Sequence, residues 1–201
     1  MINEIIIATG NIHKIKEIKF ILKDLSFKII SMTSFHLWPV IVENGRTFEE
    51  NASKKAISAA LFFKKWALAD DSGVEVDCLN GDPGVYSARY AGKKCNSNEN
   101  NEKLLRVLKN IPIEKRTAKF KSSIAVANPK GEIILLENGE IFGKIVESIG
   151  ICGFGYDSVF YIDKYKKTLS ELNFNVKNSI SHRAKALQKI KKKLIKYMYG
   201  K

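Results

Sequence analysis

The chain has 201 residues, of which 45% are hydrophobic and 27% charged, and it carries a formal net charge of +13. This composition is typical of a globular protein and excludes a disordered, collagen-like or coiled-coil chain. No apolar run approaches the roughly 18 residues that a membrane span needs, and the first ten residues lack the basic start of a signal peptide, so we expect no membrane partner. Three cysteines without a Cys-x-x-Cys spacing argue against a disulfide framework or a zinc site, and favour the reducing cytoplasm.

Strand and helix patterns alternate along the first third of the chain. Apolar β-branched runs predict short buried strands, and apolar residues at helical spacing predict amphipathic helices. Thr47 and Glu50 have the spacing of a capping box, which marks the start of a helix. The predicted strands cover residues 5–8, 27–30 and 67–69, and the predicted helices cover residues 15–25 and 48–66. We expect the third strand to end at Asp70-Asp71-Ser72-Gly73.

A long hairpin is predicted in the second half of the chain. Residues 117–127 and 132–147 alternate in polarity around the turn sequence Asn128-Pro129-Lys130-Gly131. Helical patterns precede and follow it, over residues 100–108 and from about Ser181 onward. Strand–helix units followed by a hairpin predict an α/β fold with a mixed, twisted β-sheet flanked by helices. We expect a single domain over residues 1–201, in two lobes without a separable linker.

The positive charge has two explanations. It lies mostly in the second half of the chain, and a basic surface of this kind could bind a polyanion. However, lysine supplies 29 of the 34 basic residues and arginine only 5, which together with abundant isoleucine and asparagine is typical of A/T-rich codon usage. Proteins that read DNA favour arginine, so we prefer the compositional explanation and expect no nucleic-acid partner.

A polar turn joins the first predicted strand to the first predicted helix. It reads Thr9-Gly10-Asn11-Ile12-His13-Lys14. Backbone N–H groups at a helix N-terminus attract phosphate, and a lysine in the first turn adds a positive charge. The turn is not a P-loop, because the Gly-x-x-x-x-Gly-Lys pattern is absent. It is a candidate phosphate site, although a plain strand-to-helix turn capped by Asn11 has the same features.

Acidic residues mark two further candidate sites, one at Asp70-Asp71 and one at Glu43. Asp70 and Asp71 directly follow an apolar strand, and ligands of open α/β sheets bind beyond the carboxyl ends of strands. Glu43 lies upstream of the helix predicted from residue 48, so the helix dipole does not account for it. Mg²⁺ prefers oxygen ligands and takes one or two carboxylates together with substrate phosphates. An Asx-type turn at Asp71 is the structural alternative, and we favour a metal or general-base function.

The fourth candidate site is rich in glycine. It reads Gly153-Phe154-Gly155-Tyr156-Asp157, and Lys177 and Ser181-His182-Arg183 follow it along the chain. Glycines let a backbone approach a ligand closely, and an aromatic ring can stack on a nucleobase. A β-bulge and a helix cap would explain the same residues without a ligand. Phosphate contacts, a carboxylate site for Mg²⁺ and a base pocket together predict nucleotide chemistry.

Six motifs follow one another in a characteristic order. They are Ala8-Thr9-Gly10-Asn11-x-x-Lys14, Thr47-Phe48-Glu49-Glu50-Asn51-Ala52, Ala69-Asp70-Asp71-Ser72-Gly73, Pro83-Gly84-Val85-Tyr86-Ser87-Ala88-Arg89-Tyr90, Gly153-Phe154-Gly155-Tyr156-Asp157 and Ser181-His182-Arg183. In this order they resemble the Ham1/RdgB family of noncanonical purine nucleoside triphosphate pyrophosphatases, which are inosine and xanthosine triphosphatases. The resemblance runs from residue 5 to about residue 187.

The resemblance implies a hydrolase and assigns roles to residues. It implies a homodimer that uses Mg²⁺ to convert ITP, dITP and XTP to the monophosphate and pyrophosphate, which cleanses the nucleotide pool. It also implies an elongated two-lobed fold with the substrate in a central cleft. Asp71 would be the proton acceptor, and the metal ligands would be Glu43, Asp71 and Asp70. The triphosphate would contact Thr9, Gly10, Asn11, Ile12, His13, Lys14, Lys55 and Ser72. The base would contact Phe154, Gly155, Tyr156, Asp157, Lys177, His182 and Arg183.

The chain departs from the family pattern at two positions. Ser158 follows the glycine-rich motif where proline is usual, and we expect this to loosen the loop. Val42 precedes Glu43 where a second acid is often found, so the metal assignment there depends on Glu43.

Two other functions fit parts of the sequence. A nucleic-acid-binding protein would use the basic second half and show a steep salt dependence, but it leaves Glu43, Asp70 and Asp71 unexplained. A pyrophosphatase acting on a modified pyrimidine or a dinucleotide would keep the phosphate site and differ in the base pocket.

Overall fold

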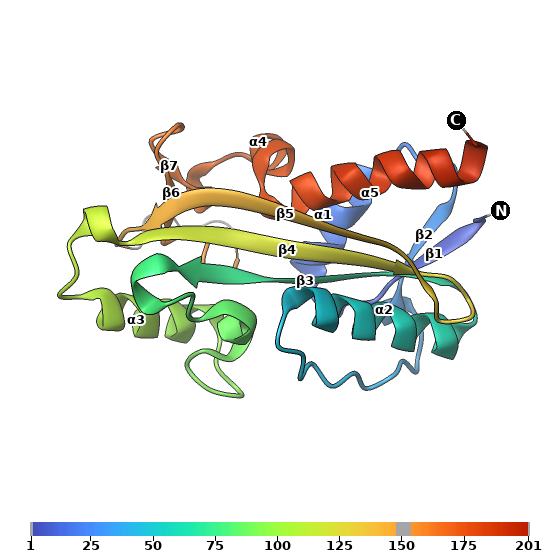
Figure 1. Ribbon diagram of the computed structural model, residues 1–201, viewed down its shortest axis with the longest axis horizontal. Helices are drawn as coiled ribbons and strands as arrows, with labels where there is room; N and C mark the ends of the chain where they lie inside the picture. Colours follow the sequence, from blue (N-terminus) through green and yellow to red (C-terminus); the bar gives the residue numbers. More distant parts are fainter. Residues whose placement is uncertain (1, 148–153, 201) are drawn as a thin grey trace. The chain divides into compact units, whose positions relative to one another are not determined.

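The fold is built on one mixed β-sheet. The computed structural model describes residues 2–147 and 154–200 (Figure 1). Its seven strands have the order β2-β1-β3-β4-β5-β6-β7, with β1 parallel to β2 and β3, and β6 antiparallel to β5 and β7. The strands are β1 (Glu4–Ile7), β2 (Lys28–Ser31), β3 (Trp66–Val76), β4 (Thr117–Ala127), β5 (Ile133–Ile145), β6 (Phe160–Ile162) and β7 (Lys167–Thr168). The α-helices are α1 (Ile12–Leu22), α2 (Phe48–Phe63), α3 (Ser97–Leu108), α4 (Phe174–Ile180) and α5 (His182–Tyr199). The mixed α/β sheet predicted from the sequence is confirmed.

The chain divides into two compact units. Unit 1 comprises Met1–Asp71, Ser122–Gly139 and His182–Lys201, and unit 2 comprises Ser72–Lys121 and Glu140–Ser181. β3 therefore contributes its first residues, up to Asp71, to unit 1 and the remainder to unit 2. In the described ranges, no helix is long and apolar enough to cross a membrane.

Unit 1 has a sheet that is covered on both faces. Side chains alternate between the two faces of a strand, so Ile5 and Ile7 of β1 belong to one hydrophobic cluster and Ile6 belongs to another. The first cluster lies against α1 and α5, which present apolar stripes to the strands and lysines to solvent. The second cluster lies against α2. Figure 1 shows α1 and α5 on one side of these strands and α2 on the other.

Small side chains characterise the α2 face of unit 1. Helix α2 presents four buried alanines, and the strands meet them with further alanines, so helix and sheet can approach closely. The alanines are Ala52, Ala56, Ala59 and Ala60 of the helix and Ala67, Ala69, Ala125 and Ala127 of the sheet. This close packing brings Lys55 of α2 within reach of Asp71 of β3.

Unit 2 has its own hydrophobic cluster. It combines Val74 and Val76 of β3 with Leu104 and Leu108 of α3 and with residues of β4, β5 and β6. Helix α3 begins with a capping box. The Asn96 side chain accepts a hydrogen bond from the Glu99 backbone N–H, and the Glu99 side chain accepts one from the Asn96 backbone N–H. This cap fixes where the first turn of α3 begins.

The structure differs from the sequence expectations at one important point. The third strand does not end at Asp70 but continues through Asp71 and Ser72 to Val76. The charged pair is tolerated inside a strand because cationic side chains from three helices neutralise it, as described below. The short elements β6, β7 and α4 were not anticipated from the sequence.

Candidate active site

The polar turn after β1 is shaped by its own side chains. Asn11 caps α1, and its Oδ1 accepts hydrogen bonds from the backbone N–H groups of His13 (2.9 Å) and Lys14 (3.2 Å). Thr9 Oγ1 accepts from the Asn11 backbone N–H at 3.2 Å. The first turn of α1 contains no acidic residue, and Gly10, Asn11, Ile12 and His13 are exposed. The turn is therefore an exposed helix N-terminus that favours an anion.

Lys14 points from this turn to the sheet. Its Nζ lies 2.5 Å from Asp70 Oδ2 of β3, and 15% of its side chain is exposed. Burial lowers the pKa of Lys14, and the charge of Asp70 opposes that effect. Asp70 therefore holds the Lys14 ammonium in place and favours its charged form.

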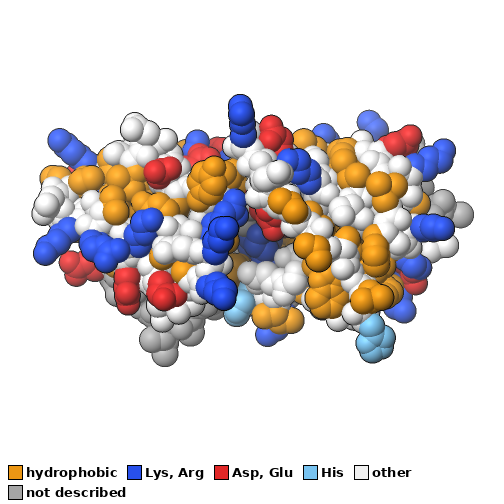
Figure 2. All heavy atoms as spheres, turned by 90° about the horizontal axis from the view of Figure 1, so that it is seen from below, with side chains coloured by type: hydrophobic (Ala, Val, Ile, Leu, Met, Phe, Trp, Pro, Cys, Tyr) orange, Lys and Arg blue, Asp and Glu red, His pale blue; other side chains and the backbone are white. Residues whose placement is uncertain are grey.

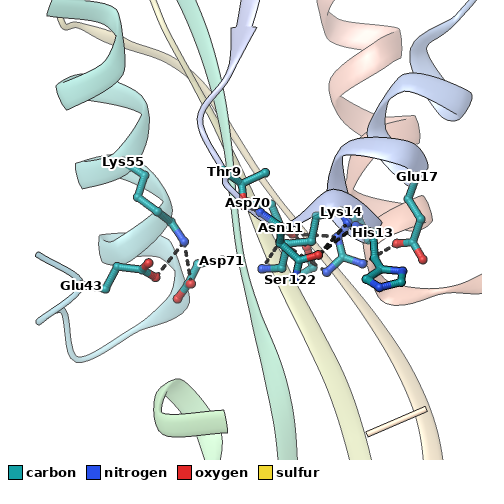
Figure 3. Close-up of polar contacts among 11 residues, drawn as sticks. Thr9, Asn11, His13, Lys14, Glu17, Glu43, Lys55, Asp70, Asp71 and Ser122 are labelled. Carbon is teal, nitrogen blue, oxygen red and sulfur yellow. Dashed lines mark hydrogen bonds and ion pairs between the residues drawn. The ribbon is translucent and has the colours of Figure 1, made fainter. Parts of the chain in front are cut away.

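Asp70 is the centre of a buried polar cluster (Figure 3). Besides Lys14, it contacts Ser122, whose Oγ donates to Asp70 Oδ1 at 2.5 Å, and Arg183, whose Nη2 donates to Asp70 Oδ2 at 3.3 Å. Arg183 also donates from Nη1 to Glu17 Oε2 at 2.5 Å. Burial alone would raise the pKa of Asp70, but Arg183 and Lys14 outweigh it and hold that pKa well below its usual range. Asp70 is therefore a buried carboxylate whose charge is fully compensated within unit 1.

Asp71 belongs to a different cluster, on the α2 face. Lys55 Nζ of α2 lies 2.8 Å from Asp71 Oδ1 and 2.8 Å from Glu43 Oε2. Burial raises the pKa of Asp71, and Lys55 acts against this rise. Burial also raises the pKa of Glu43, but the charge and hydrogen bond of Lys55 lower it by more. One ammonium group thus binds two carboxylates. Asp71 is the stronger base of the two, because its pKa is raised and that of Glu43 is lowered.

The donor set of this cluster suits a hard divalent cation. Glu43 and Asp71 both bring a carboxylate oxygen within 2.8 Å of one Lys55 atom, which matches the one or two carboxylates that Mg²⁺ takes in nucleotide sites. Within the described residues, no group of three or more His, Cys, Asp or Glu side chains is gathered as a metal site. Asp70, expected as a third ligand, faces the other side of β3 and is paired with Lys14 and Arg183. Its carboxylate therefore lies in a different environment from those of Glu43 and Asp71, beside cations of α1 and α5.

Three residues of the expected base pocket, Phe154, Asp157 and Lys177, lie together in unit 2. Lys177 Nζ of α4 lies 2.7 Å from Asp157 Oδ2 and 4.5 Å from the centre of the Phe154 ring. Asp157 Oδ2 also accepts from the Phe154 backbone N–H at 2.8 Å. Tyr156 is directed elsewhere: it is buried, and its hydroxyl donates to the Ser87 carbonyl at 2.8 Å. Phe154 is therefore the ring of this segment that lies beside a cation and a carboxylate. Gly153, the first residue of the motif, lies outside the described residues.

The remaining expected site residues take three positions. Ser72 lies within β3, half-buried. His182 is the first residue of α5 and is buried. Arg183, next to it, is only 1% exposed and forms its ion pairs with Glu17 and Asp70 inside unit 1. Arg183 thus contributes to the Asp70 cluster, a position that its expected role in the base pocket did not anticipate.

Sequence reasoning missed two members of the Asp70 cluster, Glu17 and Ser122. Glu17 is buried on α1, three residues after Lys14 and four before Ile21, so it shares a face with both. An acid on the apolar face of an amphipathic helix was the signal that could have identified it. Ser122 carried no such signal, because its partner lies on another strand.

The chain is similar to known proteins over most of its length. A model of the Ham1 family matches residues 5–193. The dITP/XTP pyrophosphatase of Clostridium perfringens is 48% identical to this chain, and the match covers 94% of this chain and 96% of that protein. The dITP/XTP pyrophosphatase of Desulforamulus reducens is 47% identical, and the match covers 92% of each chain. A solved structure of a HAM1 protein from Coxiella burnetii matches with a TM-score of 0.88 at 40% identity, covering 98% of this chain and 100% of that chain.

Proposed function

The chain belongs to the Ham1 family, and on that premise we propose that it hydrolyses dITP, XTP and ITP to the monophosphate and pyrophosphate. The cluster of Glu43, Lys55 and Asp71 supports this reaction most directly. It combines a basic carboxylate, a second carboxylate suited to Mg²⁺ and a cation that can meet a phosphate oxygen. The reaction would clear deaminated purines from the nucleotide pool.

Asp71 is the proposed proton acceptor. A water molecule held at its carboxylate would attack the α-phosphorus in line with the leaving pyrophosphate, and would pass its proton to Asp71. The new bond joins the water oxygen to the α-phosphorus, and the bond that breaks joins this phosphorus to the bridging oxygen. Burial raises the pKa of Asp71, which makes it a stronger base than an exposed aspartate.

Glu43 and Asp71 are the proposed metal-holding residues. When bound there, Mg²⁺ would neutralise the charge that develops on the phosphate oxygens. Lys55 donates to both carboxylates, so in this proposal its ammonium would lie beside phosphate oxygens bound at that site. In this proposal Asp70 has a separate task, which is to hold Lys14 for the triphosphate.

The turn after β1 is the proposed triphosphate-binding segment. Thr9 to Lys14 offer an exposed helix N-terminus, and Lys14 adds a charge that Asp70 maintains. Lys55 and Ser72 complete the proposed phosphate contacts. The positive charge would also stabilise pyrophosphate as it leaves.

Selection of the base is proposed to depend on Lys177. Hypoxanthine and xanthine carry a carbonyl oxygen at C6, where adenine carries an amino group. A lysine donor matches the oxygen and leaves the amino group unpaired, and a buried unpaired polar group can discriminate by several orders of magnitude. Phe154 supplies the stacking surface and Asp157 orients Lys177, whereas His182 is the proposed further polar contact.

We also propose that the protein is a cytoplasmic homodimer. Cys78 and Cys95 are free thiols, which suits a reducing compartment. Hydrophobic side chains are exposed at several places on the face shown in Figure 2. Helix α2 and the segment before it expose Leu37, Trp38, Val40, Val42, Leu61 and Phe62. A second copy of the chain would cover them. Sedimentation should give twice the mass of the chain, and a monomer at every concentration would refute the dimer.

The reaction can be tested by measuring pyrophosphate release from ITP, dITP, XTP, GTP and ATP, each with Mg²⁺ and with EDTA. We expect strong Mg²⁺-dependent release from the first three and little from GTP and ATP. Release from all five would retain the phosphate chemistry and refute the base selection. No release from any of them would refute the proposed function and favour the basic surface, which a salt-dependent nucleic-acid titration would then examine.

A further inference from the structure

Helix α3 contacts the glycine-rich segment through two side chains one helical turn apart. Ser97 Oγ accepts from the Gly155 backbone N–H at 3.3 Å. Asn101 Nδ2 donates to the Gly155 carbonyl at 3.1 Å and to Ser158 Oγ at 3.2 Å. Residues i and i+4 share a helix face, so one face of α3 binds both polar groups of Gly155. All of these residues belong to unit 2.

Packing alone does not explain an asparagine at position 101. The side chain is buried, at 7% exposure, and within the described residues its Oδ1 has no hydrogen-bond partner. A buried unpaired oxygen destabilises a fold, and a leucine of similar size would avoid this loss. The hydrogen bonds of the Asn101 amide group in the described residues come from Nδ2. Its two hydrogens are donated to the Gly155 carbonyl and to Ser158 Oγ.

The peptide that Asn101 holds lies between the two rings of the segment. Gly155 has a φ of 64°, in the left-handed region that favours glycine. On one side of it, Phe154 has its ring against the Lys177 ammonium. On the other side, the Tyr156 hydroxyl is bound to the Ser87 carbonyl. Asn101 holds the peptide that joins Gly155 to Tyr156, and Ser97 holds the peptide that joins Phe154 to Gly155. The two side chains together therefore limit the direction in which Phe154 leaves the backbone.

We propose that Asn101 is a positioning residue for base recognition: it holds Gly155 and Ser158 so that Phe154 and the Asp157–Lys177 pair have one orientation. This inference rests on the proposed function, in which these residues bind the purine. The Ser158 hydroxyl accepts one of the two Asn101 hydrogen bonds. A proline, which the resemblance implies at this position, would fix φ through its ring, whereas serine leaves φ free and is held here through its side chain.

The test compares three variants with the wild type. Asn101→Leu removes both hydrogen bonds at nearly constant volume. Asn101→Leu/Ser158→Pro restores a backbone constraint at residue 158 by other means. Asn98→Leu is the matched control, because Asn98 is an exposed residue of the same helix. The readouts are KM and kcat for ITP, the ITP-to-ATP ratio of kcat/KM, inhibition by pyrophosphate, and hydrogen exchange of the amides of residues 154–158.

For Asn101→Leu we expect KM for ITP to rise about tenfold, as for the loss of two ordinary hydrogen bonds, with kcat nearly unchanged. The ITP-to-ATP ratio should fall, exchange at residues 154–158 should speed up, and inhibition by pyrophosphate, which has no base, should stay the same. In the double variant, KM for ITP should return most of the way to the wild-type value, and exchange at residues 154–158 should slow again. Asn98→Leu should behave as the wild type.

Two results would overturn the inference. One is an Asn101→Leu protein with unchanged KM, selectivity and exchange. The other is a uniform loss, in which exchange speeds up throughout unit 2 and the ITP and ATP reactions fall by the same factor, because this is a structural role only. A wild type that does not hydrolyse ITP refutes the proposed function instead, and exchange at residues 154–158 then decides by itself whether Asn101 orders the segment.

Discussion

Asp70 and Asp71 are consecutive residues of β3, yet their carboxylates lie on opposite faces of the strand. Asp70 contacts Lys14 of α1 and Arg183 of α5, whereas Asp71 contacts Lys55 of α2 (Figure 3). The alternation of side chains along a strand makes this separation unavoidable. It also gives the two acids different electrostatic environments, because the pKa of Asp70 is held low by cations while burial raises that of Asp71. We therefore expect the two carboxylates to differ in function.

Replacing Asp71 tests the chemical role. Asp71→Asn keeps the shape of the side chain and removes its basicity, so we expect turnover of ITP to fall by about 10³-fold or more. The thermal unfolding transition should remain cooperative. Asp163→Asn is the control, since Asp163 forms a surface ion pair with Lys144. An Asp71→Asn enzyme with nearly normal pyrophosphate release would remove Asp71 from the mechanism.

Replacing Lys55 tests how the pKa of Asp71 is set. The positive charge of Lys55 lowers the pKa values of Asp71 and Glu43, so Lys55→Met should raise both. A base is active when deprotonated, and a higher pKa moves the acidic limb of the kcat/KM profile to higher pH. The measurement is a pH–rate profile for ITP from about pH 5 to pH 9. Lys54→Met is the matched control, because Lys54 is the exposed neighbour that binds Asn44. An acidic limb that stays in place, or moves to lower pH, contradicts the assignment.

The sequence predicted this region in part. The apolar run before Asp70 and the helix after Thr47 follow from local periodicity, and both are present. The end of the third strand was predicted wrongly, because the strand was expected to stop at Asp70 and instead continues to Val76. If the predicted strand had been extended by two residues, the alternation of side chains between its two faces would have shown from the sequence alone that Asp70 and Asp71 point to opposite sides.

Other parts of the site could not be derived from local patterns. Arg183 meets Glu17 only because α5 packs beside α1, although the two residues lie near opposite ends of the chain. The role of Asn101 depends in the same way on where α3 meets the glycine-rich segment. Such contacts are set by tertiary packing, whereas the order of motifs along the chain was enough to indicate phosphate, metal and base recognition.

Replacing Lys177 tests base selection. Lys177→Met retains an unbranched apolar stem and removes the donor that Asp157 orients. We expect the ITP-to-ATP ratio of kcat/KM to fall at least about tenfold, because the 6-oxo group loses its partner. Lys167→Met, at an exposed lysine of β7, serves as the control. A ratio that does not change would show that the base is selected elsewhere.

Replacing Asp70 tests whether its cluster stabilises unit 1. Asp70→Asn leaves Arg183 and Lys14 with a neutral partner in a buried site, and we expect a loss of about 3 kcal/mol in the free energy of unfolding at pH 7. Because the folded pKa of Asp70 is held below its unfolded value of about 3.9, its contribution is complete above that pH and is lost as the pH falls toward the folded pKa. The difference between wild type and variant should therefore shrink below about pH 4.

Urea denaturation at pH 7 and in steps down to about pH 3 measures this dependence. Asp24→Asn is the matched control, since Asp24 pairs with Lys191 of α5 at the surface of the same unit. Its stability should stay close to that of the wild type at neutral pH. If Asp70→Asn were no less stable than Asp24→Asn, or if its deficit were the same at every pH, the ion pairs of Asp70 would not be what holds α1 and α5 against β3.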